Sequence, residues 1–148
     1  EELDPNGESK LNPREAMWIL KQVDQLLGAG ILPEEIAVIA PYSAQVRFLR
    51  DKCKNSSVEI DTVDGFQGRE KEAVLISLVR SNAQGEVGFL SDTRRMNVAM
   101  TRAKRKLIVI GDGSTLGRNS FFQSWIEHTE NQGFYKSIWE FDPWQEDP

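Results

Sequence analysis

The spacing of apolar residues predicts a helix near the start of the chain. Apolar positions recur three or four residues apart from Met17 to Leu27, which is the period of one helix face. Asn12 and Pro13 stand before this run, where Asn is suited to capping and Pro to the first helical position. Glu15 completes a capping box, so we expect the helix to begin at Pro13.

Three more helices are predicted by the same period, over residues 43–53, 94–102 and 114–129. Ser43 and Ser114 are the expected caps of the first and the last of them. Met96, Ala99 and Met100 form the expected inner face of the helix between them.

Short apolar runs predict strands at 36–40, 58–60, 73–79 and 107–110. Such runs are apolar on both faces of a strand, and they alternate with the helices. This pattern is typical of an α/β domain in which a mostly parallel central sheet is flanked by helices, a three-layer fold. Because ligands meet the carboxyl ends of strands in such sheets, we look for chemistry in the loops that begin at Pro41, Thr62, Arg80 and Gly111.

Composition narrows the class of protein. The chain has 148 residues, of which 39% are hydrophobic and 28% charged, and this indicates one ordinary globular domain rather than a disordered or fibrous chain. No apolar run is long enough to cross a membrane, so no membrane partner is expected. The single Cys53 allows no internal disulfide, which fits a reducing, intracellular compartment. One Cys and one His are too few for a structural zinc site, and no metal ligands are predicted.

The net charge of −5 is concentrated at the two ends of the chain. Residues 1–9 and 139–148 each hold four acids and no base, so the intervening residues have 18 bases and 15 acids. We expect 1–10 to be a solvated tail or the cut end of a longer protein, 11–133 to be the folded domain, and 134–148 to be an aromatic, acidic tail that packs against the domain's own sheet. Because the residues between the two acidic ends have more bases than acids, the charge of the chain does not exclude nucleic acid as a partner.

Six bases fall between Arg94 and Lys106 without an intervening acid. The planar guanidinium group of arginine can donate two parallel hydrogen bonds to a phosphate. The helical period places Arg94 and Asn97 on one stripe of the helix, and Arg95 and Arg102 on the neighbouring stripe. The alternative is a solvated basic helix face, which is what most charge runs are. The Asn among the arginines and the strand that follows favour a phosphate-facing role.

Two other segments carry candidate chemistry. The turn after the second strand contains Gly68, where a backbone can approach a ligand closely, and Glu70, which can accept hydrogen bonds from a ribose hydroxyl. A polar loop with a local Arg–Glu pair is the alternative for this turn. Tyr42 follows a strand end, and the alternative for it is a ring packed at the corner between strand and helix.

Taken together, 41–45, 62–72 and 94–104 resemble motifs IV, V and VI of superfamily 1 helicases. They are most similar to the group that contains the nonsense-mediated-decay helicase, senataxin and the immunoglobulin mu-binding protein helicase. The order, the spacing and the intervening strand Ala73-Val74-Leu75-Ile76-Ser77 all match. The resemblance runs from about Ile36 to Asp112, over half of the chain.

The resemblance implies that the chain is the second, C-terminal RecA-like domain (domain 2A) of a two-domain motor. Such a motor binds ATP with Mg²⁺ between its two domains. Arg102 would be the arginine finger. Gly68, Glu70 and Arg95 would also contact ATP, and Gln67 would couple the nucleotide state to the nucleic acid. The single strand of DNA or RNA would contact four residues: Tyr42, Thr62, Arg94 and Asn97. The N-terminal RecA-like domain of the same parent chain would be the partner across the cleft.

Three parts of a complete motor do not occur in this sequence. It contains no Gly-x-x-x-x-Gly-Lys-Ser/Thr phosphate loop, no Asp-Glu pair at a strand end, and no Gln-Tyr-Arg-Met segment. In the family these lie upstream, so we expect the chain to be a piece that hydrolyses no ATP by itself. A non-catalytic nucleic-acid- or protein-binding module on the same fold is the main alternative. A dinucleotide site at residues 111–117 is a weaker one, because the third glycine of the pattern is one residue late.

Overall fold

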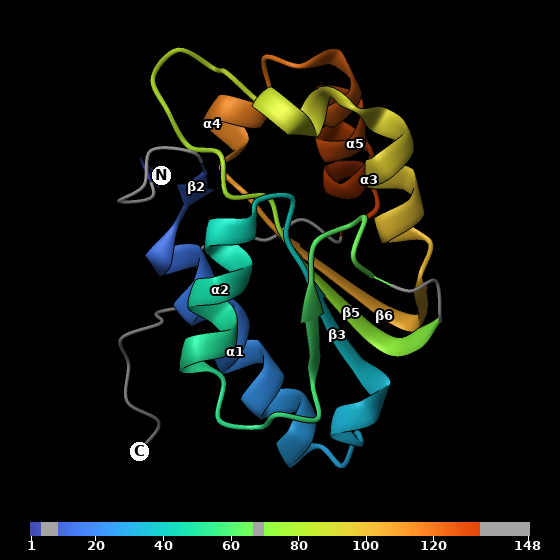
Figure 1. Cartoon of the computed structure of the whole chain (residues 1–148). Helices are drawn as coiled ribbons and strands as arrows, with labels where there is room; N and C mark the ends of the chain where they lie inside the picture. Colours follow the sequence, from blue (N-terminus) through green and yellow to red (C-terminus); the bar gives the residue numbers. More distant parts are fainter. Residues whose placement is uncertain (4–8, 67–69, 134–148) are drawn as a thin grey trace, which may run out of the picture.

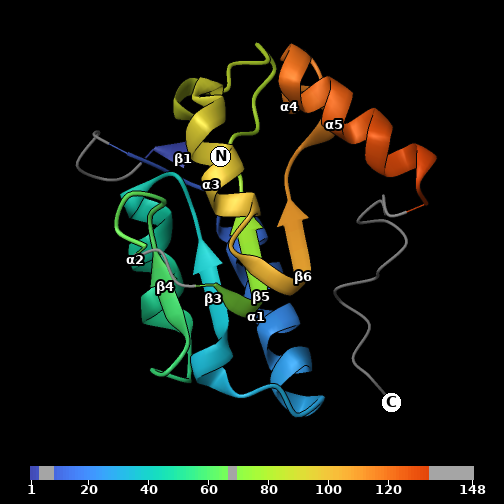
Figure 2. The same cartoon turned by 90° about the vertical axis from the view of Figure 1, so that its right-hand side faces the viewer.

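The computed structural model describes residues 1–3, 9–66 and 70–133 of the chain, and its layers are visible in Figures 1 and 2. A four-stranded parallel sheet has the order β4-β3-β5-β6. Its strands are β3 (Ile36–Ile39), β4 (Glu59–Asp61), β5 (Lys71–Ser77) and β6 (Ala103–Ile110). The helices are α1 (Pro13–Gly28), α2 (Ser43–Lys52), α3 (Thr93–Met100), α4 (Gly113–Leu116) and α5 (Ser120–Asn131), with 3₁₀ turns η1 (Pro33–Glu35) and η2 (Gly88–Ser91).

Helices cover both faces of the sheet, so the predicted three-layer α/β fold is confirmed. Alternate residues of β3 and β5 point to opposite faces. Val38 and Leu75 pack under α1 and α2, whereas Ile39 and Ile76 pack under α3 and α5. The resulting fold is RecA-like. None of the helices in the described residues is long and apolar enough to span a membrane.

Local signals predicted the first helix correctly and two of the caps wrongly. Asn12 accepts from the Glu15 backbone N–H and donates to the Glu15 carboxylate, which is the expected capping box. At α2 the cap residue is Tyr42, which makes no side-chain cap bond. The Oγ of Ser9, distant in sequence, accepts from the Ala44 N–H at this helix end instead.

The predicted helix over 114–129 is wrong as a single element, because it is divided into α4 and α5. Asp112, not Ser114, caps α4 by accepting from the Ser114 N–H, and Asn119 caps α5 through Phe121 and Phe122. A local oxygen acceptor before each segment gives both of them their own start.

The first three residues were expected to belong to a solvated tail or to the cut end of a longer protein; Glu2 and Leu3 are exposed, but the Glu1 side chain is not solvated. β1 (Glu2–Leu3) pairs antiparallel with β2 (Lys10–Leu11), and the Glu1 side chain is largely buried. The reason is a buried arginine, described below, whose charge the Glu1 carboxylate neutralises. The C-terminal tail, 134–148, lies outside the described residues.

Candidate functional site

Glu70 and Arg102 lie side by side at the amino ends of β5 and β6. Each immediately precedes its strand, and the register pairs Lys71 with Ala103. The Lys71 N–H donates to the Arg102 carbonyl at 2.9 Å, which fixes the two backbones together. The Glu70 side chain is exposed, so a carboxylate and a guanidinium are presented at one edge of the sheet.

The Arg102 side chain folds back over the end of α3. Its Nε donates to the Val98 carbonyl at 3.2 Å and its Nη2 to the Thr101 hydroxyl at 3.3 Å. A guanidinium is favoured at a helix C-terminus, where carbonyl groups lack intrahelical donors. Both bonds lie at the protein surface, where a single hydrogen bond contributes about 0.5–1.5 kcal/mol to stability.

Tyr42 and Thr62 lie at the opposite, carboxyl edge, after β3 and β4. Thr62 caps a tight turn in which its Oγ1 accepts from the Gly65 N–H at 3.1 Å. The side chain of Thr62 borders a small hollow together with Asp64, Phe89 and Arg95. The sheet therefore separates the predicted site residues into two groups.

Arg95 belongs to the carboxyl-edge group, although it was predicted to bind ATP with Arg102. It forms ion pairs at 3.3 Å with Asp64 and with Asp92. Two turns of α3 separate Arg95 from Arg102, and the structure does not bring it together with Glu70. Arg94 and Asn97 are exposed on the same helix, and within the described residues Arg94 has no ion pair.

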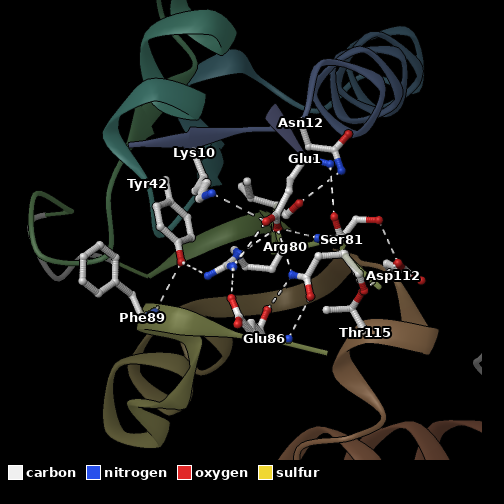
Figure 3. Close-up of polar contacts among 12 residues, drawn as sticks. Glu1, Lys10, Asn12, Tyr42, Arg80, Ser81, Glu86, Phe89, Asp112 and Thr115 are labelled. Carbon is white, nitrogen blue, oxygen red and sulfur yellow. Dashed lines mark hydrogen bonds and ion pairs between the residues drawn. The ribbon is translucent and has the colours of Figure 1, made fainter. Parts of the chain in front are cut away.

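A buried arginine, Arg80, organises the carboxyl edge (Figure 3). It is 6% exposed, and its Nε donates to the Glu1 carboxylate at 2.7 Å. Its Nη1 donates to the Tyr42 hydroxyl at 3.1 Å, and the same hydroxyl accepts from the Phe89 N–H at 3.3 Å. Burial raises the pKa of Glu1, but hydrogen bonds from Arg80, Ser81 and Asn82 outweigh this effect and hold the pKa below its usual value. The pair is therefore charged at neutral pH.

The turn that delivers Arg80 is strained. Val79 has a φ of 68°, and the Arg80 N–H donates to the Leu78 carbonyl at 2.7 Å. A β-branched residue in this region costs about 1–3 kcal/mol, so surrounding bonds must hold it. The buried Glu15 carboxylate does so, because it accepts from the Val79 N–H at 2.9 Å and from the Ser77 hydroxyl at 2.8 Å.

Burial raises the pKa of Glu15 to about 7, against the opposing effect of its bonds to Val79 and Ser77. Gln45 is also fully buried, and it joins the same network by donating to Ser77 and to the Asn12 carbonyl. The network ties α1, α2 and β5 together beneath the carboxyl edge.

Comparison with known proteins places these features in a family. A family model described as "AAA domain" matches residues 1–114. The mouse "DNA-binding protein SMUBP-2" is 44% identical over 92% of this chain, which covers 14% of that protein. The "DNA polymerase alpha-associated DNA helicase A" of Schizosaccharomyces pombe is 45% identical over 88% of the chain, 20% of its own length. The "ATP-dependent helicase NAM7" of Saccharomyces cerevisiae is 39% identical over 90% of the chain, 15% of its own length. The chain belongs to the superfamily 1 helicase family. It spans a fifth or less of each of these relatives.

Some residues of this helicase-family domain were missed by sequence reasoning, and others fall outside its described part. Arg80 was named only as the start of a loop, although an arginine directly after a buried strand is a signal for a structural role. Nothing local marked Phe89 or Val79. Gln67 and Gly68, predicted for coupling and for ATP binding, lie outside the described residues.

The bonds of the Tyr42 hydroxyl give one test of the carboxyl edge. Tyr42→Phe leaves the buried Arg80 guanidinium and the Phe89 N–H without their shared acceptor. We expect the free energy of unfolding of the 148-residue chain to fall by about 1–3 kcal/mol, measured by urea denaturation. Ser124→Ala, a hydroxyl deletion at an exposed position of α5, is the control and should change it by less than about 0.5 kcal/mol. An equal, small effect of both variants would contradict this account of Tyr42.

Proposed function

We propose that the chain is the second motor domain, domain 2A, of an ATP-dependent helicase or translocase. The observation that carries the proposal is the separation of the candidate residues into two edges. Glu70 and Arg102 lie at the amino edge, and Tyr42 and Thr62 lie at the carboxyl edge. A motor domain needs two such surfaces, one for the nucleotide and one for the nucleic acid.

At the amino edge, Arg102 is the arginine finger of this proposal. ATP with Mg²⁺ supplies the phosphoryl group and is held mainly by an N-terminal RecA-like domain of the same parent chain. Arg102 extends from the end of α3 and binds the γ-phosphate oxygens, where negative charge must be stabilised during transfer. Glu70 accepts hydrogen bonds from the ribose, and Gly68, which lies outside the described residues, is the other ATP contact of this proposal.

Arg95 has a smaller part in ATP binding than Arg102. A phosphate contact by Arg95 requires its ion pairs with Asp64 and Asp92 to open, whereas the bonds of Arg102 to Val98 and Thr101 have neutral acceptors. Exposed ion pairs are weak, and their opening is accessible when the domains close.

At the carboxyl edge, a single strand of DNA or RNA passes over Thr62, Arg94 and Asn97. These side chains offer a hydroxyl, a cation and an amide to the sugar-phosphate backbone, which gives salt-sensitive and sequence-tolerant binding. Tyr42 is buried, so its part is to place the loop that carries Phe89. Gln67 couples the two edges, because it lies in the segment that joins β4 to β5.

A direct test compares this chain with the parent protein. We expect the purified 148-residue chain to hydrolyse no ATP above background with Mg²⁺ and single-stranded DNA, because it has no phosphate loop. The parent protein, assayed in parallel, should show turnover that the single strand stimulates. Robust turnover by the short chain, or none by the parent, would contradict the proposal, and the second result would favour the non-catalytic binding module.

A further inference from the structure

Phe89 is the only exposed Phe, Tyr or Trp in the part of the chain that the structure describes. Its side chain is 61% exposed, whereas the next residue, Leu90, is fully buried. A single exposed apolar residue is common and needs no explanation by itself. What distinguishes Phe89 is how it is held and what lies next to it.

The ring of Phe89 is held in one place by buried neighbours. It packs on the ring of Tyr42 with centroids 5.2 Å apart and planes tilted by 32°. Its N–H donates to the Tyr42 hydroxyl, which Arg80 also binds (Figure 3). Gly88 fits tightly against this group, since a Cβ there would lie 2.3 Å from Arg80 Nη1 and 2.5 Å from the Tyr42 hydroxyl. A buried arginine and tyrosine therefore fix an aromatic ring that remains open to solvent.

The ring borders the hollow at the carboxyl edge of the sheet. The other walls of this hollow include Thr62, Asp64 and Arg95, which are polar, and Pro41 and Met96, which are apolar. Arg94 is exposed and adjoins Arg95 in the first turn of α3, and it forms no ion pair with the residues that the structure describes. An aromatic face, a polar rim and a nearby cation are thus presented together.

We propose that Phe89 is a stacking platform for one base of the bound single strand, an inference that rests on the proposed function. A base has a flat π face to lie on Phe89 and polar edges that suit the rim formed by Thr62 and Asp64. Its phosphate lies within the field of Arg94. Stacking of this kind is tolerant of sequence, because every base has a π face.

The chemistry of the hollow favours a base over a protein partner. A stable protein interface has an apolar core and buries on the order of 1,000 Å² or more. Here one exposed ring stands beside a hollow with both apolar and polar walls, and ion pairs to Asp64 and Asp92 hold Arg95 at the rim. A base that stacks on one ring needs no such area, because its face covers the ring while its polar edges meet the polar side chains.

The test measures binding of the parent protein to fluorescein-labelled oligothymidylate and oligouridylate, and to the same strands with one abasic position moved along the footprint. Phe89→Ala should weaken binding of the intact strands by about 5- to 150-fold, whereas Phe89→Trp should retain it. Leu32→Ala removes a side chain that is 64% exposed, just before η1 at the other edge of the sheet, and should change nothing.

The abasic strands separate a stacked base from a general effect. At one place in the footprint, an abasic position should weaken strand binding by the wild type as much as Phe89→Ala weakens binding of the intact strand. Phe89→Ala should bind this abasic strand as tightly as it binds the intact one. Unchanged binding by Phe89→Ala, or equal losses at every abasic position, would overturn the platform while leaving the proposed function intact. A loss of ATP turnover in the absence of any strand would assign Phe89 to a contact between domains and would also overturn it. Failure of the wild type to bind any strand would overturn both proposals.

Discussion

Replacing Arg102 by alanine in the parent protein is expected to reduce strand-stimulated ATP turnover by about 10³-fold or more, with nucleotide affinity nearly unchanged. The guanidinium is needed most in the transition state, where charge develops on the transferred phosphoryl group. In the structure Arg102 rests on the carbonyl end of α3, bonded to Val98 and Thr101. Both of these bonds lie at the protein surface.

Arg105→Ala is the matched control for Arg102→Ala. Arg105 stands three residues further along, on β6, where its side chain is 82% exposed and pairs with Glu72. We expect its loss to leave turnover within about twofold of the wild type, because exposed ion pairs contribute little. Arg102→Lys keeps the charge but not the planar fork, so it should recover only part of the activity. Equal turnover of wild type and Arg102→Ala would show that the finger is assigned to the wrong residue.

The second large effect is a dependence of stability on the protonation of Glu15. Burial raises the pKa of this carboxyl from 4.5 to about 7. The native state therefore holds the proton more tightly than the unfolded state does, and the resulting stabilisation is complete below about pH 4.5. This stabilisation is lost as the pH rises to about 7. Between the two pKa values the free energy of unfolding falls by on the order of 3 kcal/mol.

Glu15→Gln should remove this contribution, because an amide oxygen still accepts from Val79 and Ser77 but does not titrate. Glu1 and Asp112 act in the opposite direction, since hydrogen bonds hold their pKa values low against the effect of burial. The informative quantity is thus the difference between wild type and variant. Measured by urea denaturation from pH 5 to 7, the free energy of unfolding of the wild type should fall relative to that of Glu15→Gln. Glu130→Gln, at an exposed position of α5, is the control. Parallel pH profiles for wild type and Glu15→Gln would contradict the assignment.

Signals within a few residues were enough to predict much of the fold. The capping box at Asn12 and Glu15 placed the start of α1, and the four apolar runs placed the strands of the parallel sheet. At α2 and at Arg80, by contrast, the partner is distant in sequence. Ser9 supplies the acceptor expected from Ser43, and Glu1 neutralises Arg80 from the far end of the chain.

The sequence predicted which residues form the candidate site better than it predicted how they are arranged in space. Looking for ligands at the carboxyl ends of strands led to Tyr42 and Thr62, but Glu70 and Arg102 meet at the amino ends. Their proximity depends on the parallel register of β5 and β6, which periodicity does not reveal. The positive φ of Val79 depends on a buried carboxylate 64 residues away in sequence, so no local pattern marks it.

Hydrogen exchange of the parent protein, with and without each ligand, tests the two-edge arrangement most directly. A non-hydrolysable ATP analogue should slow exchange at Glu70–Lys71 and around Arg102, while single-stranded oligothymidylate should slow it at Tyr42, Thr62 and Phe89. Each ligand should slow exchange most at its own edge, with a smaller effect of the nucleotide around Arg95, which is proposed to reach the phosphates when the domains close. Stronger protection of Glu70–Lys71 than of Thr62 and Phe89 by the single strand, or the reverse by the nucleotide, would contradict the assignment of the two surfaces.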